Sequence, residues 1–451
     1  MTELLSIILA AGEGTRMRSS LPKVLHKVGG LPMLGHVVRA SQAAGATAIC
    51  VVVGPNHEAV EATVRSMAPG ATISRQVYRL GTGHAVREAR AVFAEAKGNV
   101  VVLYGDGPML RPETIQDVAA RLDAGADIVV VGFEPEDPLR YGRLITEGGR
   151  LLAIREFADA SEAERQIRLV NSGLMGFRAD ALRRVIDRIE NKNAKGEYYL
   201  TDAVELANAD GMRVEHTVAD ANEVLGIDDR PRLAKAEAQF QALRREDFME
   251  AGVTLHDPAT VYFSYDTEIG RDVVIEPNVV FGPGARIGDG VTIKAFSHIE
   301  GAAVEAGATI GPFARLRPGA QIGEGAHIGN FVEIKAAEIG KGAKVNHLTY
   351  IGDASIGPGT NVGAGTITCN YDGINKDRTT IGANAFIGSN TSLVAPITVG
   401  DGAYIASGSV LTEDVPADAL ALGRARQVNK PGYAPKIREQ AAAKKAAKQK
   451  R

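Results

Sequence analysis

Several residue types and sequence features are rare or missing in this sequence of 451 residues, and each absence excludes some classes of protein. Tryptophan is missing, and there are only two cysteines, Cys50 and Cys369, which lie far apart in the sequence. That usage excludes a disulfide framework and fits a reducing cytoplasm. No run of 18 apolar residues occurs, so we expect no membrane-spanning helix. The net charge is only -3, which gives no indication of a nucleic-acid-binding surface.

The two ends of the sequence carry no clear targeting signal. The start, "MTELLSIILAAGEG", has neither a basic segment nor a small-residue cleavage site, so it predicts a first strand rather than a signal peptide. The end, "KKAAKQKR", is basic, and we expect a solvated, frayed terminus rather than a site for an anionic partner. We therefore expect a cytoplasmic protein without nucleic-acid or membrane partners.

The first half of the chain, residues 1–228, predicts an α/β domain. Four short β-branched runs are typical of strands buried on both faces: "LLSIILA", "AICVVVG", "NVVVLYGD" and "DIVVVGF". Helical patterns such as "TGHAVREARAVFAEAKG" separate them, which favours a mostly parallel, Rossmann-like sheet covered by helices. Ligands of such sheets bind beyond the carboxyl ends of the strands.

Residues 229–252 predict a single linker helix. Asp229 and Pro231 are favourable at a helix start, and Gly252 is favourable at a helix end. One face of this helix is apolar, so we expect that face to pack against another part of the protein. Its residues are Leu233, Ala236, Phe240 and Leu243.

Glycine, by contrast, is abundant, with 51 residues, and the second half of the chain explains why. From residue 253 onward, aliphatic residues recur every six positions, often followed by glycine, which is the hexapeptide signature of a parallel β-helix. Only the stretch 366–380 breaks the pattern, and we expect it to leave the coils as a loop. The repeat positions are Ile269, Ile275, Phe281, Ile287, Ile293 and Ile299, then Val304, Ile310, Leu316, Ile322, Ile328 and Ile334, then Ile381, Ile387, Leu393, Val399, Ile405 and Leu411.

A glycine-rich loop, "LAAGEGTRM", follows the first predicted strand. It matches neither the dinucleotide fingerprint nor the P-loop, yet such a loop lets backbone N–H groups approach phosphate oxygens. We assign phosphate contacts to Leu9, Ala10, Ala11 and Gly12. Arg16 and Lys23 would neutralise a polyphosphate, and Asp106, after a buried strand, is a natural Mg²⁺ ligand. Each feature taken singly also fits a plain structural turn.

Taken together, these motifs resemble a known family. "LAAGEGTRM", "LPKVL", "QVYRLGTGHA" and "YGD" are similar to sugar-1-phosphate nucleotidyltransferases. "RLRPGA", "GNFVEIK", "NHLTYIGD" and "NVGAGTITCNYDG" extend the resemblance to the bifunctional bacterial N-acetylglucosamine-1-phosphate uridyltransferase / glucosamine-1-phosphate N-acetyltransferases. The resemblance covers nearly the whole chain. It implies a left-handed β-helix, a homotrimer, and a product, UDP-N-acetylglucosamine, used in cell-wall and outer-membrane glycolipid synthesis.

For the uridyltransferase site, the resemblance implies UTP and Mg²⁺ as co-substrate and cofactor. Asp228 becomes the second metal ligand; the family commonly has Asn there, and the extra negative charge would strengthen metal binding or weaken the hold on the polyphosphate. Tyr78 and Arg79 are further departures, with no evident role. The implied base and sugar contacts are Gln76, Gly81, Thr82, Tyr104, Gly105, Gly142, Glu156 and Asn171.

For the acetyltransferase site, the chemistry requires a base, because a sugar ammonium must lose a proton before it attacks acetyl-CoA. His347 fits that role, and Glu333 is expected to orient its imidazole. Arg317 and Lys335 would bind the sugar phosphate. Tyr350 and Asn361 resemble the sugar-binding set, and Asn370 and Tyr371 both that set and the acetyl-CoA set. The remaining acetyl-CoA contacts implied by the resemblance are Ala364, Ser389, Ser407 and Arg424.

We therefore predict a bifunctional enzyme with domains at 1–228 and 253–451, joined by the helix at 229–252. Two alternatives remain at this point. One is a single-activity nucleotidyltransferase whose β-helix is structural or regulatory, against which His347, Lys335 and "NYDG" argue. The other is a non-catalytic regulatory subunit, against which the intact glycine loop argues.

Overall fold

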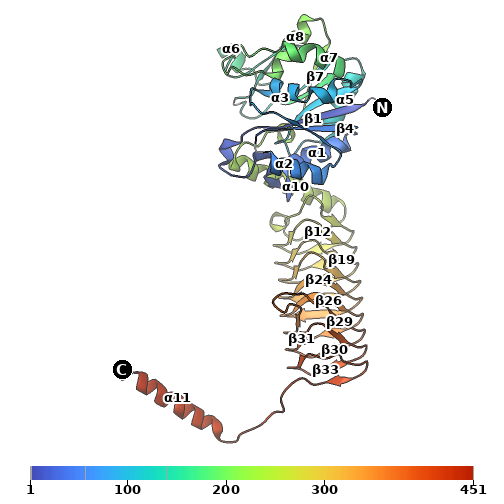
Figure 1. The fold of residues 1–451 in the computed structure, drawn as a ribbon, viewed down its shortest axis with the longest axis vertical. Coiled ribbons are helices and arrows are strands. Elements are labelled where there is room, and N and C mark those ends of the chain that lie inside the picture. Colours follow the sequence, from blue (N-terminus) through green and yellow to red (C-terminus); the bar gives the residue numbers. More distant parts are fainter. Residues whose placement is uncertain (1–2, 56, 139, 450–451) are drawn as a thin grey trace. The chain divides into compact units, whose positions relative to one another are not determined.

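The computed structural model describes residues 3–55, 57–138 and 140–449. The chain forms two compact units. One contains the residues up to Asp247 together with Phe263–Tyr265, and the other contains Phe248–Tyr262 and the residues from Asp266 onward. Figure 1 shows the sheet and helices of the first unit and the stacked short strands of the second.

The α/β unit is built on a nine-stranded sheet whose central order is β11-β7-β10-β6-β1-β4-β5. All four predicted strands are present as β1, β4, β6 and β7. The pairs β1–β4, β1–β6, β4–β5 and β7–β11 are parallel, whereas β10 is inserted antiparallel between β6 and β7. The strands are β1 (Leu4–Ala10), β2 (Lys27–Val28), β3 (Leu31–Pro32), β4 (Ala48–Val53), β5 (Thr72–Arg75), β6 (Asn99–Tyr104), β7 (Ile128–Phe133), β8 (Arg143–Glu147), β9 (Arg150–Arg155), β10 (Val170–Arg178) and β11 (Val214–Val218).

Helices cover both faces of this sheet, as the alternating pattern predicted. The predicted helical stretch after Gly81 is interrupted at Ala89 and forms two helices, α3 and α4. The helices of the unit are α1 (Met33–Ala43), α2 (Glu58–Met67), α3 (Thr82–Glu88), α4 (Arg90–Phe93), α5 (Pro112–Asp123), α6 (Glu162–Arg165), α7 (Ala179–Val185), α8 (Ala203–Ala209), α9 (Ala221–Val224) and α10 (Arg230–Glu250), with short 3-10 turns η1 (Thr15–Met17), η2 (Lys23–Leu25), η3 (Ile186–Arg188) and η4 (Leu200–Asp202).

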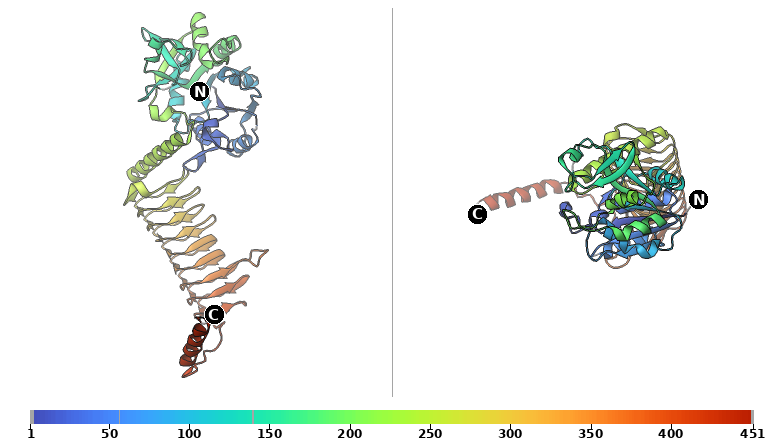
Figure 2. Two further views of the ribbon diagram at one scale, coloured as in Figure 1. Left: turned by 90° about the vertical axis from the view of Figure 1, so that its left-hand side faces the viewer. Right: turned by 90° about the horizontal axis from the view of Figure 1, so that it is seen from above.

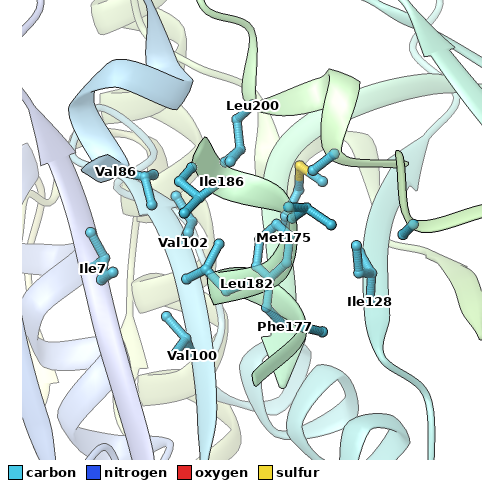
Figure 3. Close-up of a cluster of buried hydrophobic side chains, with 14 of the residues drawn as sticks. Ile7, Val86, Val100, Val102, Ile128, Met175, Phe177, Leu182, Ile186 and Leu200 are labelled. Atoms are coloured by element: carbon cyan, nitrogen blue, oxygen red, sulfur yellow. The ribbon is translucent and has the colours of Figure 1, made fainter. Parts of the chain in front are cut away.

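The sheet has a hydrophobic core on each side, which explains its continuous apolar strands. Alternate residues of β1 enter opposite clusters: Ile7 joins the cluster shown in Figure 3, and Ile8 joins the other. Both side chains are fully buried. Because both faces are covered, an unpaired polar side chain within a strand would be costly, and the polar side chains of the site lie at the carboxyl edge.

Helix α10 packs through the predicted apolar stripe, with one exception. Leu233, Ala236 and Phe240 contact Val28, Met33 and Ile227. Leu243 is 37% exposed, so its predicted packing is wrong. Phe240 lies so close to Gly29 that a Cβ there would be 2.2 Å from the ring, which explains the glycine at that turn.

The second unit is a parallel β-helix, as the hexapeptide pattern predicted. Every predicted repeat position from Ile275 to Leu411 is buried. Equivalent residues of successive coils pair in parallel register, for example Ile293 with Ile310 and Ile310 with Ile328. Figure 2 shows the stacked coils. The left-handed sense implied by the resemblance stays a prediction.

The coils present a ten-stranded face and a fourteen-stranded sheet. The larger sheet covers two faces because β24 and β26 run around a corner and pair on both sides of it. The strands are β12 (Thr254–Leu255), β13 (Glu268–Ile269), β14 (Val274–Ile275), β15 (Val280–Phe281), β16 (Arg286–Ile287), β17 (Thr292–Ile293), β18 (His298–Ile299), β19 (Ala303–Val304), β20 (Thr309–Ile310), β21 (Arg315–Leu316), β22 (Gln321–Ile322), β23 (His327–Asn330), β24 (Glu333–Ile339), β25 (Lys344–His347), β26 (Tyr350–Ile356), β27 (Asn361–Val362), β28 (Ile367–Cys369), β29 (Thr379–Ile381), β30 (Phe386–Ile387), β31 (Ser392–Val394), β32 (Ile397–Val399), β33 (Tyr404–Ile405), β34 (Val410–Leu411) and β35 (Leu420–Ala421).

Two irregular segments leave the coils. The predicted loop at 366–380 is shorter than expected, because its ends form β28 and β29 and only residues 370–378 leave the stack (Figure 2). The chain ends in helix α11 (Tyr433–Gln449), and the side chains of residues 433–448 are exposed, as predicted for the basic tail. No helix in the described ranges is long and apolar enough to cross a membrane.

Candidate active sites

The α/β unit has a cavity of about 460 Å³ at the carboxyl edge of the sheet. It gathers the predicted nucleotide and sugar contacts from segments spread over more than 200 residues. Two predicted residues lie beside the cavity rather than in its wall: Gly105, whose N–H donates to Leu9 O at 3.0 Å, and Arg16. The predicted residues that line it are Leu9, Ala10, Ala11, Gly12, Lys23, Gln76, Gly81, Thr82, Tyr104, Asp106, Gly142, Glu156, Asn171 and Asp228.

The glycine loop is shaped for close approach. Gly14 has φ +67°, and a Cβ at this position would lie 2.6 Å from Lys23 Cβ, so only glycine lets η2 pack here. No acceptor for the backbone N–H of Gly12 or Glu13 is found within the described ranges. Free N–H groups at the end of a buried strand are well suited to bind phosphate oxygens.

Lys23 connects two carboxylates that are distant in sequence. Its Nζ donates to Oδ1 of Asp228 at 3.0 Å and also to Oδ2 of Asp106. Burial opposes the charge of Lys23, but the two carboxylates outweigh it and raise the pKa of Lys23 above its usual value. Arg16 and Arg232 contact the other oxygen of Asp228, at 2.9 and 3.3 Å. Five charged groups therefore converge on one edge of the cavity.

The same carboxylates fit a magnesium site. Asp106 and Asp228 both reach a single cationic nitrogen, so their oxygens lie close enough to share one cation. Mg²⁺ in nucleotide enzymes takes one or two carboxylates and completes its shell with phosphate oxygens and water. In the described part of the chain, no cluster of three or more His, Cys, Asp and Glu side chains gathers as a metal site.

The opposite wall carries buried polar side chains. Gln76 is only 4% exposed, and its amide donates to Gly81 O at 3.0 Å. Glu156 accepts a 3.3 Å hydrogen bond from Thr201, and burial raises the pKa of its carboxyl. Asn171 accepts from the N–H of Gly173 at 3.0 Å. These side chains are held in place, so their remaining polar atoms are preorganised for a ligand.

Arg79 is a cavity residue that sequence reasoning missed. Its Nε donates to Ala11 O at 2.8 Å, and it lines the cavity together with Gly12. In a trans peptide the C=O and the following N–H point in opposite directions, so this bond turns the N–H of Gly12 away from Arg79. The only signal in the sequence was an arginine where no structural need for one was evident.

In the β-helix unit, the predicted acetyl-transfer residues form a column along one corner. We define the corner column as Asn330, His347, Ala364, Ser389 and Ser407. Backbone hydrogen bonds stack its members coil on coil: Leu348 N donates to Asn330 O at 3.1 Å, Gly365 N to His347 O at 3.1 Å, Asn390 N to Ala364 O at 2.7 Å and Gly408 N to Ser389 O at 2.8 Å.

His347 is exposed, so substrates can reach its imidazole. Its Nδ1 lies 2.7 Å from Asn330 Oδ1. The predicted orienting residue, Glu333, instead accepts from Arg317 at 2.7 Å. Within this chain, therefore, the partner of the imidazole is Asn330, which the motif "GNFVEIK" contains but which we did not single out from the sequence.

The predicted sugar-phosphate ligands and Tyr350 lie on the adjoining face: Arg317 directly after β21, Lys335 on β24 and Tyr350 on β26. Glu333 and Tyr350 are register partners, and Lys335 donates to both oxygens of Asp353, at 3.0 and 3.1 Å. Asn370 donates to the same carboxylate. Burial opposes ionisation of Asp353, but the bonds from Lys335 and Asn370 outweigh it and lower the pKa of the carboxyl. Asp353 is a third residue that sequence reasoning missed, after Arg79 and Asn330.

The other predicted contacts surround this region. Asn361 lies on the ten-stranded face, paired with Lys344 and Phe386. Tyr371 is 58% exposed on the loop at 370–378. The Cδ of Arg424 lies 3.9 Å from the position of a Cβ on Gly408, beside Ser407. The structure thus places Arg424 at the far end of the corner column from Asn330.

A phosphate-binding α/β unit joined to a β-helix that exposes a histidine defines a two-site transferase. Comparison with protein families agrees with each half. Residues 6–173 match the MobA-like NTP transferase domain. Residues 266–301, 301–336 and 378–413 match the bacterial transferase hexapeptide (six repeats).

The chain belongs to the family of the bifunctional protein GlmU. It is 57% identical over 435 residues to that protein of Azorhizobium caulinodans, which covers 96% of this chain and 97% of the relative. It is 56% identical over 435 residues to that of Xanthobacter autotrophicus, with the same coverage. It is 53% identical over 446 residues to that of Agrobacterium fabrum, covering 99% and 98%. The predicted family, fold and bifunctional uridyl- and acetyltransferase activity leading to UDP-N-acetylglucosamine are thereby confirmed.

Proposed function

We propose that the α/β unit carries out the uridyl transfer and the β-helix unit the acetyl transfer, each with its own set of residues. The observation that carries this proposal is that the two predicted residue sets fall in separate compact units. The domain limits 1–228, 229–252 and 253–451 and the assignment of each residue's role belong to the proposal. A cytoplasmic location also belongs to it, because UTP and acetyl-CoA are cytoplasmic metabolites.

In the uridyl transfer, a phosphate oxygen of N-acetylglucosamine-1-phosphate attacks the α-phosphorus of UTP. The new P–O bond forms as the bond to the bridging oxygen breaks and pyrophosphate leaves. The glycine loop presents free N–H groups to the triphosphate, and Lys23 and Arg16 stabilise the negative charge that develops. Gln76 would bind the uracil edge, and Glu156 and Asn171 the sugar hydroxyls and acetamido group.

Asp106 and Asp228 would hold Mg²⁺ in this site. The cation, when bound, neutralises charge on the phosphates. Lys23 and the metal compete for the same carboxylate oxygens, so we infer that Lys23 moves from the carboxylates to the phosphates when both nucleotide and metal are present. The two arginines that contact Asp228, Arg16 and Arg232, then remain to balance its extra negative charge.

In the acetyl transfer, His347 removes a proton from the ammonium of glucosamine-1-phosphate. The neutral nitrogen attacks the thioester carbon of acetyl-CoA, the C–S bond breaks, and the thiolate of CoA leaves and takes up a proton. Arg317 and Lys335 would bind the sugar phosphate. Acetyl-CoA would follow the corner column, with its thioester between His347 and Ser389, within reach of the amine that His347 deprotonates, and a phosphate at Arg424.

We further propose that the active form is a homotrimer. Support comes from an apolar ladder beside the corner column, in which Phe331 and Leu348 directly follow Asn330 and His347 in the chain. The ladder consists of Phe296, Phe313, Phe331 and Leu348, and each of these side chains is about half exposed or more. The three phenyl rings stack at 4.9 and 5.0 Å. All four residues have positive φ, a conformation that is costly for bulky side chains, whereas Asn278 and Asn390 occupy the same position in other coils. A neighbouring copy covering the ladder would explain why this strain is retained.

The oligomer is tested by the double variant Phe313→Asn/Phe331→Asn, because asparagine tolerates positive φ. We expect monomers in sedimentation, loss of acetyl transfer and retained uridyl transfer. A double variant that remains trimeric contradicts the ladder as an interface.

The two-site assignment is tested with purified protein, glucosamine-1-phosphate, acetyl-CoA, UTP and Mg²⁺, omitting one component at a time. His347→Ala should abolish acetyl transfer and spare uridyl transfer, and Asp106→Ala should do the reverse. The retained activity shows that the other unit is intact, and circular dichroism with thermal unfolding verifies that the unit carrying the substitution is folded. If either folded variant loses both activities, the assignment of the sites to separate units is wrong.

A further inference from the structure

Asn330 and His347 occupy equivalent positions in consecutive coils. They are register partners of β23 and β25, and their side chains meet at 2.7 Å between Oδ1 and Nδ1. In the described part of the chain no other side chain makes a hydrogen bond or ion pair with the imidazole. The orientation of the ring therefore depends on one polar contact.

The backbone of His347 is fixed independently of that contact. Its carbonyl accepts from Gly365 N at 3.1 Å and from Thr349 Oγ1 at 2.7 Å. Parallel pairing with the coils on both sides fixes the position of Cα. Only rotation about the two side-chain bonds remains free, and Asn330 is placed to restrict it.

We infer that Asn330 is a positioning residue that selects the reactive nitrogen of His347. An amide oxygen can only accept, so the proton of the neutral imidazole lies on Nδ1. Nε2 then carries the lone pair and is the atom that receives the proton of the sugar ammonium. This inference rests on the proposed role of His347 as the base.

The geometry favours Asn330 over Glu333 for this task. Glu333 pairs with Tyr350, beyond the corner, and its carboxylate is occupied by Arg317 at 2.7 Å. The bond with Glu333 also raises the pKa of Arg317. Unlike the carboxylate of Glu333, the neutral amide of Asn330 orients the ring without adding a negative charge beside the amine substrate.

The test uses two variants of the full chain. Asn330→Leu keeps the size of the side chain and removes the acceptor. We expect kcat for acetyl transfer to fall about tenfold to a hundredfold, the range seen when the outer partner of a functional histidine is removed, with little change in KM. Asn330→Asp restores an acceptor for Nδ1–H and should recover most of that loss. Asn278→Gly, at an exposed asparagine with positive φ elsewhere in the β-helix, serves as the control, because glycine adopts this conformation without strain.

Nitrogen-15 NMR of the histidine-labelled wild-type protein reports the tautomer directly, with the His347→Ala spectrum used to assign the signal. We expect the proton on Nδ1. A proton on Nε2, an unchanged kcat in Asn330→Leu, or an Asn330→Asp variant as slow as Asn330→Leu would each overturn the inference. If His347→Ala itself retains acetyl transfer, the proposed function fails instead, so the two failures are distinguishable. Circular dichroism and thermal unfolding verify that the β-helix of every variant is folded, because uridyl transfer reports only on the α/β unit.

Discussion

The ammonium of Lys23 lies 3.0 Å from the carboxylate of Asp228, although 205 residues separate them in the sequence. The same ammonium bonds to Asp106, so the positive charge of Lys23 lies between the two carboxylates that we propose to hold Mg²⁺. The bridge keeps two acidic groups together in a buried edge of the cavity, where an unpaired pair would repel. The site is thus assembled before metal and nucleotide arrive.

The first prediction concerns the charge of Asp228. Asp228→Asn should keep uridyl transfer but raise the Mg²⁺ concentration for half-maximal activity at least about fivefold, because one formal charge contributes about 1 kcal/mol to cation binding even with the full screening of bulk water. Calorimetric titration of Mg²⁺ into the protein–UTP mixture should show the same shift. An unchanged metal titration would count against Asp228 as a ligand. Acetyl transfer, measured without Mg²⁺, is the control.

A second prediction follows from the bond between Arg79 and Ala11. Arg79→Met should raise KM for UTP about tenfold, since a hydrogen bond from a charged group contributes about 1.5 kcal/mol or more and here orients the glycine loop. Arg79→Lys keeps the charge and should recover part of the affinity. Steady-state kinetics of both variants provide the measurement. A Met variant that binds UTP like the wild type would show that the loop needs no such support.

The third prediction uses the pair of Lys335 and Asp353. Lys335→Met should raise KM for glucosamine-1-phosphate at least about tenfold, because it removes a cation and leaves Asp353 to repel the sugar phosphate. The double variant Lys335→Met/Asp353→Asn should bind the sugar better than the single variant, since the unpaired charge is gone. Equal KM values for the two would mean that Asp353 does not face the phosphate. Uridyl transfer should be unaffected in both.

The fourth prediction is a pH dependence of stability at Asp202. Burial, reinforced by Glu205 and Glu156, raises the pKa of Asp202 to about 6. The unfolded chain titrates this carboxyl at about 3.9. Between these values the folded state binds more protons, so the contribution of Asp202 to stability falls as the pH rises from about 4 to 6 and stays unfavourable above.

Asp202→Asn should therefore raise the melting temperature at pH 7.5, and the gain should shrink as the pH falls toward 4. Thermal unfolding monitored by circular dichroism across this range provides the measurement. Glu162→Gln removes an exposed carboxyl of the same unit and should leave the profile unchanged. A gain that is equal at every pH would rule out relief of a buried charge as its cause.

Much of the fold could be predicted from local pattern. The strands β1, β4, β6 and β7 are continuous apolar runs in the sequence. Such runs are typical of strands that are buried on both faces of a sheet, so these four strands could be predicted. The antiparallel insertion of β10 could not be predicted, because β10 is recognisable as a strand only by its neighbours. Leu243 was misjudged for a similar reason: helical periodicity gives a stripe, but the partner surface decides where the stripe ends.

The candidate sites divide in the same way. The sequence by itself determined the glycine loop, the six-residue step and the choice of His347, because each is a property of a few consecutive residues. Only the tertiary structure decided which polar groups meet. Lys23 meets Asp228 because two strand ends and a helix start share one edge, and Asn330 meets His347 because a coil of this length returns the chain after 17 residues. Such partners depend on the register between distant segments, and register is set by the packing of the whole unit.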